Sequence, residues 1–157
     1  MVIVFFFNNQ IIAQTTIVDG SNENNNSGPL WCFYYNVNSQ TIYYQSEINT
    51  AGDITELQWE WDGSNTYTFD RIRIYMGHTT KTIYSSTSDQ VTDADLTLVY
   101  DGPYTVLKSG GWTPVILQTP FTYNNSENLV IYVDQETNTW GTSNNRFKFY
   151  EEPGTSN

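Results

Sequence analysis

Short segments in which apolar and polar residues alternate constrain the fold of this chain most strongly. Over residues 53–61, Leu57, Trp59 and Trp61 fall on one face of an extended strand, with Gln and Glu between them. The same period of two recurs over 71–76, and Gly, Asn and Thr turns separate such segments. No apolar period of 3.6 residues is sustained. The pattern predicts an all-β, jelly-roll-like antiparallel β-sandwich of about eight or nine strands.

The strand pattern also predicts which positions are central, peripheral or buried. The most hydrophobic segment, 128–134, belongs in the centre of a sheet, whereas Pro114 indicates an edge strand or a bulge. The polar stretch 81–95 is expected to be a long loop with one helical turn, and Asp101–Gly102–Pro103 is expected to end the strand before it. The other expected strands cover 31–37, 40–45, 96–100, 112–118 and 146–150. The residues expected to be buried are Leu57, Trp59, Ile72, Ile74, Leu98, Leu129, Ile131 and Phe147.

The charge balance excludes several classes of partner. The 157 residues carry 6 basic and 17 acidic side chains, for a net charge of −11. Nucleic acid binding requires a basic surface, so no nucleic acid partner is expected. An anionic membrane would repel the chain, and no membrane insertion is expected. The low charged fraction of 15% is typical of exported β-proteins, and the acidity itself is sufficient to keep the chain soluble.

Single copies of cysteine and histidine limit the chemistry available to the chain. Cys32 lies in an apolar run and is expected to be a buried, inert thiol without a disulfide partner. His78 follows a strand end and is expected to hydrogen-bond its own loop. Neither a nucleophile elbow nor a phosphate-binding glycine loop is present. We therefore expect no catalytic residues and no enzymatic activity, although the sequence alone does not exclude a pair of carboxylates that hydrolyses glycosides.

Composition shifts divide the chain into four parts. Residues 1–14 contain an apolar run and resemble the remnant of a signal peptide, although the run lacks a basic start; the alternative is a first β-strand. Residues 15–29 are expected to be a flexible N-terminal segment, 30–150 the β-sandwich module and 151–157 the start of a linker. Further domains of the same native chain are therefore expected.

Four strings within 30–150 are distinctive: IYMGHT at 74–79, LTLVYDG at 96–102, GGW at 110–112 and LQTPFTYNNSENLVIYVD at 117–134. Together they resemble an all-β module of secreted and surface proteins of Bacteroidota. This module often occurs beside type IX secretion sorting domains, and it implies a jelly-roll-like sandwich that is secreted or displayed on the cell surface. The resemblance carries no catalytic residues, and the chain shows no sorting domain.

Aromatic residues in turn-rich sequence make glycan binding the leading functional hypothesis. An aromatic ring covers the C–H face of a pyranose, and neighbouring Asn, Asp and Gln bond its hydroxyls. The candidate ligand-binding rings are Trp112, Trp140, Tyr104 and Tyr123, expected to be exposed. The alternative is that these rings pack beneath loops.

Acidic residues of the 81–95 loop suggest a structural calcium ion as the one possible cofactor. Asp93 and Asp95 could present oxygen ligands from one turn, with Asp89 nearby, although the full calcium-loop pattern is missing. The alternative is a solvated acidic loop.

These observations predict a non-catalytic extracellular module that mediates binding or adhesion, with a glycan or a surface protein as partner. A second hypothesis is a structural spacer, or a subunit of a surface assembly, that packs through its sheet edges. A third is an accessory domain of a secreted hydrolase.

Overall fold

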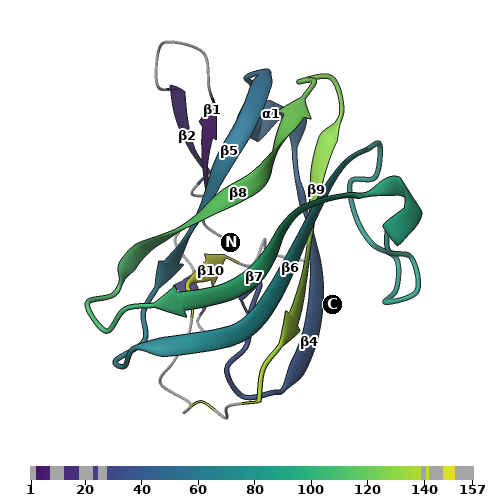
Figure 1. Ribbon diagram of the computed structural model, residues 1–157. Coiled ribbons are helices and arrows are strands. Elements are labelled where there is room, and N and C mark those ends of the chain that lie inside the picture. Colours follow the sequence, from purple (N-terminus) through teal and green to yellow (C-terminus); the bar gives the residue numbers. More distant parts are fainter. Residues whose placement is uncertain are drawn as a thin grey trace.

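The computed structural model describes residues 3–7, 13–17, 23–24, 28–138, 141 and 147–150, with the side chains of 28–138, 141, 147 and 148. The chain forms two antiparallel four-stranded sheets packed face to face, as Figure 1 shows. The first sheet has the order β2-β1-β5-β8 and the second β4-β9-β6-β7. The all-β sandwich is therefore confirmed.

Six long strands make up the body of the sandwich, fewer than the eight or nine expected in this part of the chain. Segments predicted as separate short strands prove to be parts of longer ones, and 31–37 begins with a turn in which Tyr34 N–H donates to Trp31 O. Asp101–Gly102–Pro103 lies inside a strand, which its edge position tolerates. The six are β4 (Asn36–Tyr43), β5 (Gly52–Trp61), β6 (Tyr67–Thr79), β7 (Thr97–Val106), β8 (Gly111–Tyr123) and β9 (Asn128–Glu136).

Two short strands complete a jelly-roll order. Phe147 bridges to Trp61, and Lys148 N–H donates to the Glu60 carbonyl, so the C-terminal segment runs beside the end of β5. From there β10 (Phe149–Tyr150) pairs with β3 (Glu23–Asn24). If β3 to β10 are numbered one to eight, the second sheet has the order 2-7-4-5. The separate pair of β10 and β3 meets β5 through the Phe147–Trp61 bridge and extends the first sheet in the order 1-8-3-6. This is the arrangement of a jelly roll built from two Greek keys.

The N-terminal segment extends the first sheet. The strand β1 (Ile3–Phe7) pairs with β5 on one side and with β2 (Ala13–Ile17) on the other. This pairing matches the alternative that residues 1–14 contain a first strand, but pairing does not report on cleavage, and the signal-peptide interpretation stays a prediction.

The core lies between the sheets and is rich in rings. Among the eight positions expected to be buried, all but Leu98 are fully enclosed. Leu98 is 43% exposed because a β-bulge after Ile74 shifts the register of β6 and β7 and pairs Leu98 with outward-facing Tyr75. Val99 is buried in its place. Cys32 is buried and free, as expected, and burial raises the pKa of its thiol to about 12.

The described helices are short. They are α1 (Gln45–Ile48) and the 3₁₀ turn η1 (Asp93–Asp95), which confirms the helical turn expected in the long loop. Within the described part of the chain, no helix has the length and hydrophobicity needed to span a membrane.

Candidate functional site

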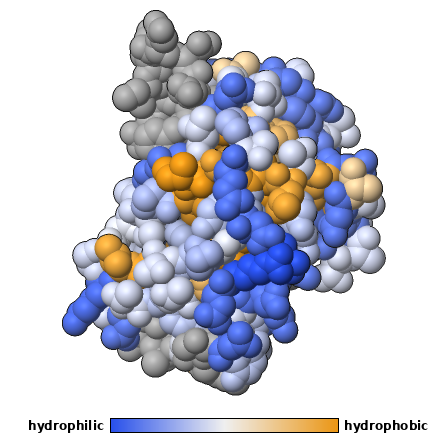
Figure 2. Space-filling model, viewed as in Figure 1, coloured by the Kyte–Doolittle hydropathy of each residue, from blue (hydrophilic) through white to orange (hydrophobic). Residues whose placement is uncertain are grey.

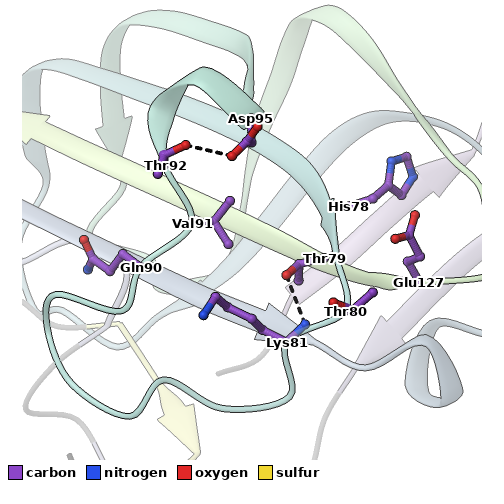
Figure 3. Close-up of a pocket in the computed structure, with 9 residues that line it drawn as sticks. All are labelled: His78, Thr79, Thr80, Lys81, Gln90, Val91, Thr92, Asp95 and Glu127. Atoms are coloured by element: carbon purple, nitrogen blue, oxygen red, sulfur yellow. Dashed lines mark hydrogen bonds between the residues drawn. The ribbon is translucent and has the colours of Figure 1, made fainter.

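The connection 80–96 between β6 and β7 forms one wall of an open pocket beside the sandwich (Figure 3). Its volume is about 590 Å³, within the range of about 300–1,000 Å³ that is usual for small-molecule sites. The end of β6 and the β8–β9 turn supply the other walls. The lining residues are His78, Thr79, Thr80, Lys81, Gln90, Val91, Thr92, Asp95 and Glu127.

Side-chain bonds from neighbouring strands hold this connection in place. The carboxamide of Gln40 on β4 donates to Val91 O at 2.8 Å and accepts from Val91 N–H at 2.9 Å, so it pairs with the loop as a strand would. Tyr84 Oη also donates to Gln40 Oε1 at 3.0 Å. Asn128 Nδ2 on β9 donates to Lys81 O at 2.8 Å. The pocket wall is thereby fixed at both ends of the loop.

Gly77 allows the η1 turn to approach β6 closely. A Cβ atom at this position would lie 2.6 Å from Leu96 Cδ2 and 2.9 Å from Asp95 O, distances that no side chain tolerates. Glycine at this point of β6 therefore lets Asp95 reach the rim of the pocket.

His78 is oriented from two sides. Its ring lies 5.7 Å from Tyr123 in a stacked arrangement and 5.1 Å from Phe121. Its Nε2 accepts the backbone N–H of Asn124 at 3.1 Å. The sequence predicted that His78 hydrogen-bonds its own loop. This prediction is wrong, because the bond goes to the β8–β9 turn. Because Nε2 is the acceptor, the neutral ring carries its proton on Nδ1.

Hydrogen bonds also orient the charged groups of the lining. Asp95 accepts the hydroxyl of Thr92 at 2.7 Å, and Glu127 accepts Asn124 Nδ2 at 3.1 Å. In Figure 3, His78 and Glu127 lie together at one side of the pocket, and Thr92 and Asp95 lie on the facing loop. Each of these carboxylates keeps lone pairs for a ligand, since an ionised carboxylate has about four acceptor positions.

The three acidic residues expected to bind calcium lie in two different surroundings. Asp89 forms an ion pair with Lys81 Nζ at 2.6 Å and accepts the N–H and hydroxyl of Ser85. The hydrogen bond from Lys81, followed by those from Ser85, lowers the pKa of Asp89 to about 2. Asp93 and Asp95 lie in η1 and are exposed. Among the side chains that the structure describes, no three His, Cys, Asp or Glu residues are grouped to hold a metal ion.

The four rings expected to be exposed have different surroundings. Trp112 is 38% exposed on the outer face of β8, opposite Glu60, so its expected exposure is confirmed. Tyr104 and Tyr123 are buried, and the expectation that they are exposed is wrong: their hydroxyls donate to Thr113 O and Glu127 O, which makes burial of the phenol favourable. Trp140 lies outside the described residues.

Two rings outside the four candidates are partly exposed on the second sheet. Tyr75 on β6 and Tyr132 on β9 are directly paired across the strands, and both are partly exposed. The alternation of β6 already directed Tyr75 outward, so the signal was present in the sequence. Tyr132 was hidden within the hydrophobic run of β9.

Comparison with known proteins gives no relatives for this chain: no protein family, curated protein or solved structure matches it. The geometry of the chain itself therefore carries the functional assignment.

Proposed function

We propose that this protein is a non-catalytic extracellular binding module of a larger secreted or surface protein, and that its pocket binds a glycan. The carrying observation is the pocket between the connection 80–96 and the β8–β9 turn. It gathers hydroxyl, amide, imidazole and carboxylate groups from separate segments of the chain. Hydrogen bonds hold several of these groups in position before any ligand arrives, which lowers the entropic cost of binding.

The chemistry of the lining favours a ligand rich in hydroxyl groups. Asp95 and Glu127 offer acceptors, while Thr80, Gln90 and the Nδ1–H of His78 offer donors. A sugar presents both kinds of group around one small ring. The polar lining is less suited to a hydrophobic ligand.

The hydrogen bond that His78 accepts argues against a role for this residue as the general base of a hydrolase. A general base needs a free lone pair directed at the proton it removes. The Nε2 lone pair of His78 already accepts the Asn124 N–H at 3.1 Å. The export of the chain and its attachment to further domains rest on the resemblance described above and on the apolar start of the sequence.

A glycan array followed by calorimetry tests this function. Asp95→Asn removes the charge of a pocket acceptor while preserving its shape, and we expect binding to weaken roughly tenfold. Asp62→Asn is the matched control, because it removes the same charge from an exposed turn before β6, at the opposite end of that strand from the pocket. Absence of binding to every glycan on the array would contradict the proposal.

One observation favours the alternative role as a spacer or assembly subunit. Trp112 and Ile116 project from the outer face of the edge strand β8 and are 38% and 63% exposed. Figure 2 shows hydrophobic side chains in separate spots over β8 and over the β6–β7 side, divided by hydrophilic ones. If this surface mediates assembly, sedimentation velocity should show association that Ile116→Lys abolishes.

A further inference from the structure

An apolar row of side chains crosses the outer face of the second sheet. Cross-strand pairing places Tyr132 beside Tyr75, and Tyr75 beside Leu98, on β9, β6 and β7. The two tyrosine rings have centroids 5.5 Å apart and planes inclined by 31°. With Leu98 43% exposed, the row presents carbon surface to solvent over about 10 Å, the width of three neighbouring strands.

A polar row runs parallel to it, two residues further along β4, β9 and β6 and three along β7, where Val99 is the extra residue. Pairing places Asn38, Asp134, Arg73 and Asp101 side by side. Arg73 forms an ion pair with Asp134 at 2.6 Å. Asp101 accepts two bonds from Arg71, at 2.6 and 2.7 Å. The charges of this row are therefore largely neutralised within the protein, while oxygen and nitrogen atoms stay available for hydrogen bonds.

The connection 80–96 closes one side of this surface. Gln40, the cross-strand partner of Tyr132, is bonded to Val91 of the connection. Partial burial, together with the carboxylates of Asp134 and Asp93, raises the pKa of Tyr132. Like any tyrosine whose pKa is not lowered, Tyr132 is protonated at neutral pH, so its hydroxyl can donate a hydrogen bond. The surface has an apolar row, a polar row and one raised rim.

We propose that this surface is a second glycan site, which binds a linear neutral polysaccharide lying across the strands. The rings of Tyr75 and Tyr132 would cover C–H faces of successive sugars, and the paired Arg and Asp groups would bond their hydroxyls. A neutral chain fits because the polar row is internally paired and the net charge of −11 repels anionic glycans. This inference rests on the proposed function only in assuming that the module recognises glycans.

Affinity gel electrophoresis on the whole chain tests the second site. The gels contain laminarin, xylan, galactomannan or hydroxyethylcellulose, with alginate as the anionic comparison. We expect at least one neutral polysaccharide to retard the wild-type protein, and alginate not to do so. Tyr75→Ala and Tyr132→Ala should each raise the dissociation constant for that polysaccharide roughly tenfold. Tyr75→Phe keeps the ring, and its dissociation constant should stay close to that of the wild type. Tyr34→Ala is the matched control, since it removes an exposed ring that lies outside the strands of the sheet.

The possible outcomes separate the two proposals. If a neutral polysaccharide retards the protein, Asp95→Asn weakens binding and both tyrosine variants behave as wild type, the second site is wrong and the proposed function stands. If Tyr75→Ala and Tyr132→Ala lose retardation while Asp95→Asn and Tyr34→Ala keep it, the second site is supported independently of the pocket. If alginate is bound better than the neutral chains, or no polysaccharide retards the wild type, the inference is wrong. Circular dichroism of each variant checks that the fold is retained.

Discussion

At the scale of single residues, hydrogen bonding decides whether a tyrosine in turn-rich sequence is buried. Tyr104 and Tyr123 were expected at the surface because Gly, Thr and Asn surround them. In the fold each phenol reaches a backbone carbonyl, a partner that sequence patterning does not reveal. Trp59 and Trp61 were assigned correctly to the core because the period of a strand fixes their direction.

The bond from Tyr104 makes a testable contribution to stability. Tyr104→Phe leaves the Thr113 carbonyl without this donor, between strands of the two sheets, and should lower the free energy of unfolding by about 1–3 kcal/mol. Urea denaturation measures the change. Tyr34→Phe is the control, since Tyr34 is 52% exposed and its change should stay within about 0.5 kcal/mol. Equal losses in the two variants would contradict this account.

The ion pair of Lys81 and Asp89 predicts a pH dependence. The pKa of Asp89 is lowered to about 2 in the folded chain, from an ordinary value of 3.8. The interaction therefore favours the folded state fully above about pH 4 and loses its effect as the pH falls through about 2. Carboxyl chemical shifts followed by NMR should give a midpoint near pH 2 for Asp89, and Lys81→Met should move it upward. A wild-type midpoint at the ordinary value would refute the pairing.

At the scale of elements, the sequence revealed the connection 80–96 but not what holds it. Its polar composition predicted a long loop with one helical turn, which the structure places at Asp93–Asp95. The connection is held by the two hydrogen bonds between Gln40 and Val91. These residues are 51 positions apart, and a single sequence carries no signal for such a distant pair. Register shifts limited the strand predictions in the same way, because the extra residue Val99 in β7 changed the direction of Leu98.

Gln40 should therefore act as a local positioning residue for the pocket wall. Gln40→Ala removes both bonds to Val91, and the Val91 amide should exchange its hydrogen faster, together with amides of 81–95. The amides of β6 and β9 should keep their protection. Hydrogen exchange read by NMR measures both groups, with Asn38→Ala as the control from an exposed neighbour on β4. An unchanged hydrogen-exchange rate at the Val91 amide would show that the two bonds from Gln40 do not fix the loop.

At the scale of the whole molecule, the all-β sandwich followed from the alternation alone, whereas its closure did not. Phe147 lies 4.9 Å from Trp61 and 6.4 Å from Trp59, measured between ring centroids. It also contacts Phe69 and Tyr104, so a single ring from the C-terminal segment joins residues of both sheets. Alternation predicted that Phe147 faces inward, but not that it completes the order of the first sheet.

Phe147 should consequently decide whether the sandwich is stable. Phe147→Ala should lower the free energy of unfolding by about 3–5 kcal/mol, because it empties a ring-sized volume in a fully enclosed core. Phe147→Leu retains most of the volume and should lose clearly less. Removal of residues 151–157 is the complementary control: as the expected linker start, they should leave the urea midpoint unchanged. If this truncation destabilised the fold as much as Phe147→Ala does, the module would extend beyond residue 150, and the closure assigned to Phe147 would belong to a longer segment.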